Sequence, residues 1–95
     1  MTIYANMLDM IGHTPMIRLS RIRKNHKSTL LGKLEFYNPT GSVKDRIALY
    51  MLEDAERQGK IKPGDTIVEP TSGNTGISLS FLCPLKGCCI LEPCL

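Results

Sequence analysis

Aromatic residues and early cysteines are scarce in this sequence. It has no tryptophan, two phenylalanines and three tyrosines among 95 residues, and no cysteine precedes position 83. It also has no apolar run near the about 20 residues that span a bilayer, and no basic segment followed by an apolar one, as in a secretory signal. The sequence therefore predicts neither a membrane protein nor a secreted disulfide scaffold, and the expected location is the cytoplasm.

A strong net charge is absent as well. Lysine and arginine number 12 against 9 aspartates and glutamates, and 42% of the residues are hydrophobic, which is typical of a folded globular protein. The one local excess is a basic cluster formed by Arg18, Arg21, Arg23, Lys24 and Lys27. Because no aromatic side chain lies among them, a solvated loop is favoured over a nucleic-acid site, and no nucleic-acid partner is expected.

The cysteines are confined to the end of the chain. All four fall within the last 13 residues, at Cys83, Cys88, Cys89 and Cys94. They lack the spacing of a zinc site and have no histidine nearby, so no metal is expected and the thiols are predicted to be reduced. We interpret residues 83–95 as a divergent, cysteine-rich tail, such as a truncated or frame-shifted product would carry.

The pattern of apolar residues predicts alternating strands and helices. A short helix is expected over residues 4–10, strands over 16–19, 29–36, 66–68 and 88–91, and longer helices over 43–58 and 75–86. The apolar stripe of the first long helix consists of Val43, Ile47, Met51 and Ala55, with Ala48 and Leu52 beside it. Asp45 is expected on the other, solvated faces. Pro84 falls inside the second long helix, where it costs about 3 kcal/mol.

Short connections between these elements indicate an α/β fold with a partial parallel sheet and flanking helices. In such sheets ligands bind beyond the carboxyl ends of the strands, where loops lead into helices. Two segments of unusual chemistry, residues 38–46 and 69–76, are expected at positions of this kind.

The first segment, Asn-Pro-Thr-Gly-Ser-Val-Lys-Asp-Arg, places Lys44 in the first turn of a helix, which Ser42 and Asp45 begin in the manner of a capping box. The unpaired N–H groups and the positive end of the helix dipole destabilise an ammonium group there, so the neutral, nucleophilic form of the lysine is favoured. Such a lysine suits covalent attachment of an aldehyde. The plainer alternative is a lysine that pairs with Asp45 or points to solvent.

The second segment, Glu-Pro-Thr-Ser-Gly-Asn-Thr-Gly, runs from a strand into a helix. Its small residues let several backbone N–H groups converge at the start of the helix, and its hydroxyl and amide side chains add further donors. The segment suits a carboxylate or a phosphate. The plainer alternative is an ordinary loop that caps a helix.

Together with Ile-Gly-His-Thr-Pro (11–15), Arg-Leu (18–19) and Lys-Leu-Glu (33–35), these two segments resemble the cysteine synthase and cystathionine β-synthase family of fold-type II enzymes, which depend on pyridoxal phosphate. The motifs follow the family's order between about residues 8 and 80. The resemblance implies that residues 1–82 are the N-terminal part of such a domain, with a tryptophan synthase β-like fold.

The resemblance also implies roles for single residues. Lys44 would be the catalytic lysine that binds pyridoxal phosphate covalently, and Asn74 would hydrogen-bond the ring hydroxyl of the cofactor. The loop that grips the α-carboxylate of the substrate would consist of Thr71, Ser72, Gly73 and Thr75. The implied reaction replaces the acetate of O-acetyl-L-serine by sulfide, so the expected partners are small molecules, and full-length members are expected to form homodimers.

One part of the family's site has no counterpart here. The family holds the cofactor phosphate in a Gly/Thr-rich loop far downstream, and no segment of this sequence matches it. The chain on its own is therefore expected to be inactive. A cystathionine β-synthase-type enzyme and a non-catalytic truncated fragment stay open as alternatives to a cysteine synthase.

Overall fold

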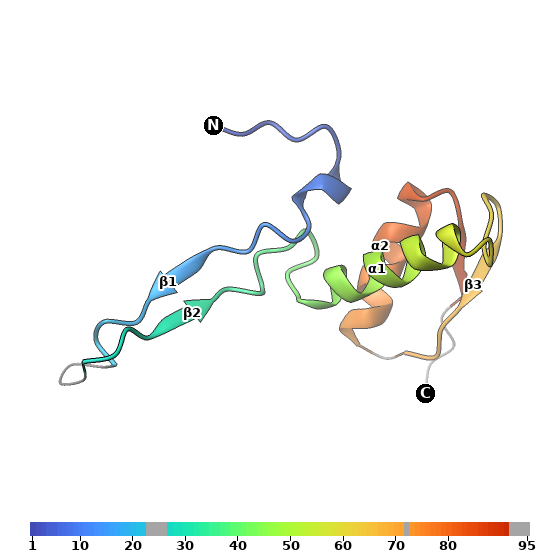
Figure 1. Cartoon of the computed structure of the whole chain (residues 1–95). Helices are drawn as coiled ribbons and strands as arrows, with labels where there is room; N and C mark the ends of the chain where they lie inside the picture. Colours follow the sequence, from blue (N-terminus) through green and yellow to red (C-terminus); the bar gives the residue numbers. More distant parts are fainter. Residues whose placement is uncertain (23–26, 72, 92–95) are drawn as a thin grey trace.

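The computed structural model describes residues 1–22, 27–71 and 73–91. In chain order its elements are a 3-10 helix η1 (Met7–Met10), strands β1 (Met16–Arg18) and β2 (Leu31–Lys33), helix α1 (Lys44–Arg57), strand β3 (Thr66–Val68), helix α2 (Asn74–Leu85) and strand β4 (Cys89–Leu91). No helix in these ranges is long and apolar enough to cross a membrane. Figure 1 shows a body that contains both α-helices, from which the β1–β2 ribbon projects.

The body contains a parallel β-α-β unit. Strands β3 and β4 pair in parallel, with Ile67 opposite Ile90, and α2 is the crossover between them. Two backbone bonds extend the pairing at either end, from Cys89 N–H to the Asp65 carbonyl (2.9 Å) and from Glu69 N–H to the Leu91 carbonyl (3.1 Å). The predicted α/β class and its parallel sheet are thus confirmed, and residues 69–71 lie at the carboxyl end of β3.

The core lies between the two α-helices. It consists of Ala48 and Leu52 from α1, Leu79, Leu82 and Cys83 from α2, and Cys88 just before β4. Small Ala48 allows the helices to approach closely, and the leucines fill the space on either side. Two residues of the segment predicted to diverge, Cys83 and Cys88, are therefore part of the core, while the boundary at residue 82 stays a prediction.

The predicted apolar face of α1, the stripe together with Ala48 and Leu52, is only partly buried. Val43, Ile47 and Met51 are exposed, whereas the buried residues of α1 are Asp45, Ala48 and Leu52. Both sets have helical spacing, so periodicity alone does not choose between the two faces. Burial of Asp45 also contradicts its predicted place on a solvated face.

Helix α2 has nearly its predicted extent, because Pro84 lies in its last turn. Pro84 is exposed, and the helix ends one residue after it. The Lys86 N–H still donates to the Leu82 carbonyl (3.0 Å), and Gly87 takes the left-handed conformation (φ 80°) that ends many helices. Proline therefore does not break this helix.

The sequence predicted the two strands of the ribbon but not their pairing. Strands β1 and β2 pair antiparallel, with Ile17 opposite Gly32, and no other strand of the described residues joins their sheet. Apolar Met16, Ile17 and Leu31 on these strands are about half exposed. The radius of gyration is 17.0 Å, against about 13 Å for a compact chain of this length, because the ribbon extends away from the helices.

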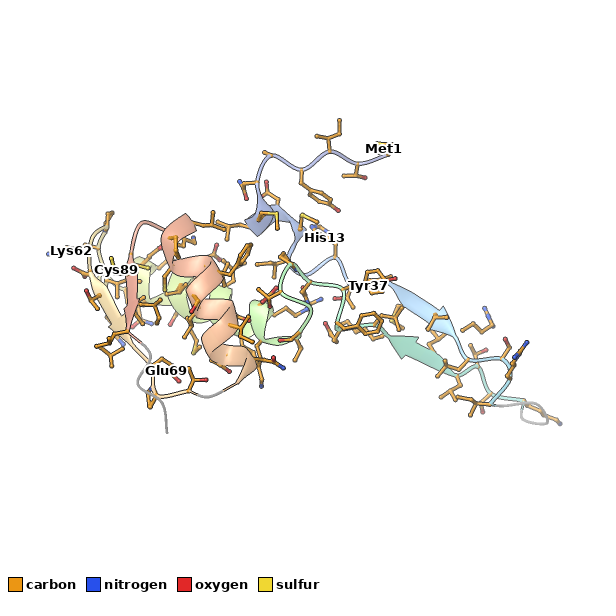
Figure 2. All side chains as sticks on the ribbon, turned by 180° about the vertical axis from the view of Figure 1, so that it is seen from behind. Met1, His13, Tyr37, Lys62, Glu69 and Cys89 are labelled. Carbon is orange, nitrogen blue, oxygen red and sulfur yellow. The ribbon has the colours of Figure 1, made fainter. Side chains whose placement is uncertain are left out.

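A polar network ties the N-terminal segment to α1. Arg46 donates from Nη2 to the Gly12 carbonyl (3.0 Å) and to Thr14 Oγ1 (2.7 Å), and from Nε to Glu35 Oε1 (3.1 Å). Lys33 pairs with the other oxygen of Glu35 at 3.1 Å. Figure 2 shows His13 and Tyr37 at this junction. One arginine of α1 thus anchors residues 12–14 and the chain that follows β2.

The core makes a first prediction for α2. Leu82 is fully buried, so Leu82→Ala is expected to lower the free energy of unfolding by about 2–5 kcal/mol, measured by urea denaturation. Leu85 in the same helix is 47% exposed and is the matched control, since Leu85→Ala should cost only about 1 kcal/mol. Equal losses from both variants would contradict the proposed core.

The network makes a second prediction, for acid stability. The hydrogen bond from Lys33 lowers the pKa of Glu35 below its ordinary value of 4.5; burial opposes this, and Thr14 and the Arg46 charge reinforce it. A carboxyl whose pKa is lower in the folded chain stabilises the fold above its unfolded pKa, and this stabilisation is lost as the pH falls through the lowered value.

The stability difference between the unsubstituted chain and Glu35→Gln should therefore be largest near neutral pH and shrink below about pH 4.5. Urea denaturation between neutral pH and pH 3 measures it. Lys33→Met removes the largest cause and should reduce the pH-dependent part of the difference. A difference that stays constant over this range would disprove the assignment.

Candidate functional site

Lys44 lies in the first turn of α1, as the sequence predicts, and it is the first residue of the helix, which begins one residue later than expected. The chain reaches it through a tight turn in which Gly41 N–H donates to the Asn38 carbonyl (2.8 Å) and Gly41 has a φ of 84°, a conformation that favours glycine. Ser42 Oγ then accepts from the Lys44 N–H (3.0 Å). The Lys44 side chain is half-buried, and its ammonium makes no hydrogen bond or ion pair with another described residue.

Asp45 is the most deeply buried charged residue of the described chain. Its carboxylate accepts from the Thr40 N–H (2.9 Å), from the Thr40 hydroxyl and from the Ser78 hydroxyl (2.6 Å). The alternative in which Lys44 pairs with Asp45 is therefore wrong. The predicted capping box is wrong as well, because Ser42 contacts Lys44 and the partner of Asp45 is Thr40.

The second segment leads from β3 into α2, and Figure 2 shows Glu69 where the chain leaves the strand. Thr71 is central to it: its Oγ1 accepts from the Gly73 N–H (3.3 Å) and from the Gly76 N–H (3.2 Å). The hydroxyl thus satisfies two donors at the start of the helix. Of the predicted site residues here, Gly73 and Asn74 are exposed and Thr75 is half-buried, while Ser72 lies outside the described residues.

Because Thr71 Oγ1 accepts two backbone hydrogen bonds, its hydroxyl can act toward a ligand only as a donor. A threonine hydroxyl has two lone pairs and one proton, and two backbone N–H groups already occupy the oxygen. The proton is then the part left for a ligand, so Thr71 suits an acceptor such as a carboxylate. The loop therefore caps the helix, as the plainer sequence-based alternative has it, and its anion-binding role stays a prediction.

The Asp45–Ser78 bond brings the two segments together. Ser78 lies four residues after Asn74, so the two share one face of α2 and are one turn apart. Asp45 in turn is the neighbour of Lys44. The turn that carries the lysine is therefore fixed against the N-terminal half of α2, the helix that follows the second segment.

Sequence reasoning missed Thr40, Asp45 and Ser78 as members of the site. A polar Ser78 within an apolar helix was the available signal, since a buried hydroxyl needs a partner.

In residues 1–22, 27–71 and 73–91, no three metal-binding side chains gather into a candidate metal site. Of the basic cluster, Arg18, Arg21 and Lys27 are exposed, and Arg23 and Lys24 lie outside the described residues.

The structure thus combines a parallel β-α-β unit, a lysine at the start of one helix and a loop of small residues that leads into a second helix. Residues 7–94 match the family model described as pyridoxal-phosphate dependent enzyme. The chain belongs to this family, whose members depend on pyridoxal phosphate, and its fold class is that of fold-type II enzymes.

Named relatives refine the comparison. The chain is 60% identical to a cysteine synthase of Staphylococcus aureus over 82 residues, which cover 86% of this chain and 26% of that protein. It is 58% identical to the cystathionine beta-synthase of Rattus norvegicus over 95 residues, which cover 96% of this chain and 17% of the relative.

A solved structure also matches this chain over nearly its whole length. The crystal structure of an O-ureido-L-serine synthase superimposes with a TM-score of 0.88 at 45% identity, over 98% of this chain and 29% of that one. The chain thus spans between about a sixth and a third of the length of the proteins it resembles. The roles of Lys44, Asn74, Thr71, Ser72, Gly73 and Thr75 stay predictions.

The geometry of Thr71 makes a third prediction. Thr71→Val removes the oxygen that caps α2 and is expected to lower the free energy of unfolding by about 1 kcal/mol, with faster amide exchange at Gly73 and Gly76. Thr71→Ser keeps the oxygen and is the control. If the valine variant is as stable and as well protected as the serine variant, the capping assignment is wrong.

Proposed function

We propose that this chain carries the cofactor-binding lysine and the substrate-carboxylate loop of a cysteine synthase. In this proposal the reaction replaces the acetate of O-acetyl-L-serine by sulfide and yields L-cysteine and acetate. The observation that carries it is the unpaired ammonium of Lys44 at the first residue of α1, in a turn held against the start of α2. Its 60% identity to a named cysteine synthase supports the choice of reaction.

The residues present fit covalent attachment of pyridoxal phosphate. Lys44 is half-buried, has no carboxylate partner among the described residues, and is the first residue of α1. Its Nζ would hold the cofactor and move the α-proton of the substrate. When bound, pyridoxal phosphate supplies an electron sink for the charge that develops at the α-carbon.

The loop at the start of α2 would orient the substrate. The Thr71 proton is left for an acceptor, and the N–H groups of the first turn of α2 add positive potential. Both favour the α-carboxylate of an amino acid. In the same scheme Ser72, Gly73 and Thr75 complete the carboxylate loop, and Asn74 faces the ring hydroxyl of the cofactor.

A cystathionine β-synthase-type reaction is the second candidate. The match to the rat cystathionine beta-synthase extends over 96% of this chain, against 86% for the cysteine synthase. Both reactions begin on an amino acid that carries a leaving group on its β-carbon, and both need the same lysine and carboxylate loop. They differ in the thiol that adds, which is sulfide in one case and homocysteine in the other.

Three further expectations belong to this proposal. Full-length enzymes of this kind would act as homodimers in the cytoplasm. The 95-residue chain alone would bind the cofactor weakly and would not make cysteine, since the downstream phosphate loop has no counterpart in its sequence. A non-catalytic role of the isolated chain agrees with this expectation.

A fourth prediction tests the lysine. The chain is incubated with pyridoxal phosphate, reduced with borohydride and mapped by peptide mass spectrometry. Lys44 should be labelled about two- to fivefold more than the exposed Lys60, which corresponds to the 0.3–1 kcal/mol effect of a helix start on a charge. Lys44→Arg should abolish the preferential label and leave Lys60 unchanged.

Equal labelling of Lys44 and Lys60 would disprove the assignment of the cofactor lysine. In a full-length enzyme that contains this segment, the same Lys44→Arg change should abolish both the yellow absorbance of the bound cofactor and cysteine formation. Supplying homocysteine in place of sulfide then separates the two candidate reactions.

A further inference from the structure

The cluster of Thr40, Asp45 and Ser78 is not used by the proposed chemistry. Asp45 and Ser78 are both fully buried, and Thr40 is half-buried beside them. No cation lies within ion-pair distance of the Asp45 carboxylate among the described residues, so its charge is stabilised by hydrogen-bond donors alone. A buried carboxylate of this kind is costly unless every donor is in place, which makes the cluster sensitive to small displacements.

The donors come from both sides of the Lys44 turn. Thr40 lies four residues before the lysine and donates through its N–H (2.9 Å) and its hydroxyl. Ser78 belongs to α2 and donates at 2.6 Å, and its Oγ lies 3.4 Å from Thr40 Oγ1. The carboxylate therefore joins the beginning of the turn, the first turn of α1 and the second turn of α2 at one point.

We propose that Asp45 is a positioning residue, which holds the Lys44 turn against α2 through Thr40 and Ser78. The inference rests on the proposed function for its chemical meaning, since Lys44 is the residue that the turn presents. An ordered first turn is what places the positive end of the helix dipole at the lysine. Loss of the carboxylate bonds would let this turn fray, and Lys44 would then react like an ordinary surface lysine.

A role of Asp45 through its charge alone would change the reactivity of Lys44 in the opposite direction, and this difference makes the inference testable. A negative charge next to Lys44 favours the ammonium form, so Asp45 acting only through its charge would suppress the reactivity of Lys44. Asp45→Asn would then increase labelling of Lys44. A positioning role predicts the reverse, and it also predicts that Ser78→Ala and Thr40→Val, which keep the charge, lower the labelling.

The experiment combines two measurements on the 95-residue chain and its variants. The first is the ratio of Lys44 to Lys60 labelling by pyridoxal phosphate after borohydride reduction. The second is hydrogen exchange at the Thr40 amide, which donates directly to Asp45, compared with the amide of Leu52 in the middle of α1. A general loss of stability speeds exchange at both amides, whereas a local role speeds it at Thr40.

In Asp45→Asn we expect the Thr40 amide to exchange about tenfold faster with Leu52 unchanged, and the labelling ratio to fall to about one. Ser78→Ala should produce a smaller change in the same direction, and Ser78→Thr, which restores a hydroxyl, should reverse it. Asp54→Asn, near the other end of α1, is the matched control and should alter neither measurement. If Asp45→Asn does not fold by circular dichroism, Ser78→Ala and Thr40→Val decide the matter.

Unchanged exchange at Thr40 in a folded variant, or a labelling ratio that rises in Asp45→Asn, would overturn the inference. If the unsubstituted chain labels Lys44 and Lys60 equally while Thr40 responds as expected, the positioning of the turn stands and the proposed cofactor lysine is wrong. The two failures are thus distinguishable.

Discussion

The contact between α1 and α2 is the constraint on which the rest of the structure depends. Consecutive residues of an α-helix point about 100° apart, so three in a row face most of the circumference. At the start of α1, Asp45 turns toward α2, and Arg46 turns toward the N-terminal segment. Because Asp45 and Arg46 are both engaged in these contacts, Lys44, the residue before them, points in a third direction. The packing of one helix therefore determines the direction of the lysine and also anchors residues 12–14.

The same packing leaves a second apolar face of α1 uncovered. Val43, Ile47 and Met51 are each between about a third and a half exposed, and the β1–β2 ribbon has no layer on either side. A small core buries too little apolar surface to offset the conformational entropy of 95 residues by a wide margin. Two-stranded ribbons are marginal by themselves, so the ribbon depends on the Arg46–Glu35 network for its attachment.

Local features of the sequence predicted local features of the fold. Strand β3 was predicted at its observed bounds, and helix α2 and the start of α1 within a residue, because β-branched runs, glycine stops and turn residues act over a few positions. The antiparallel β1–β2 pairing was not predicted, and the predicted apolar stripe of α1 did not separate its buried members from its exposed ones. Both depend on which distant segment supplies the partner, and two faces of α1 have equal helical spacing. Asp45 was misplaced for that reason, since its donors come from Thr40 and from Ser78, 33 residues away.

The beginnings of α1 and α2 share one electrostatic feature, the positive end of a helix dipole. At the beginning of α1 the positive end of the dipole lies beside Lys44, the lysine that holds the cofactor in the proposed function. The same potential at the beginning of α2 acts on whatever anion meets the Thr71 loop, which it stabilises. An amino acid that reacts at a lysine-bound cofactor needs both: a nucleophilic amine at one end and a held carboxylate at the other. The hydrogen bond between Asp45 and Ser78 joins the two helices about one turn from these starts. It therefore fixes the position of one helix start relative to the other. The carboxylate that sequence reasoning placed on a solvated face is thus the element that couples the two halves of the candidate site.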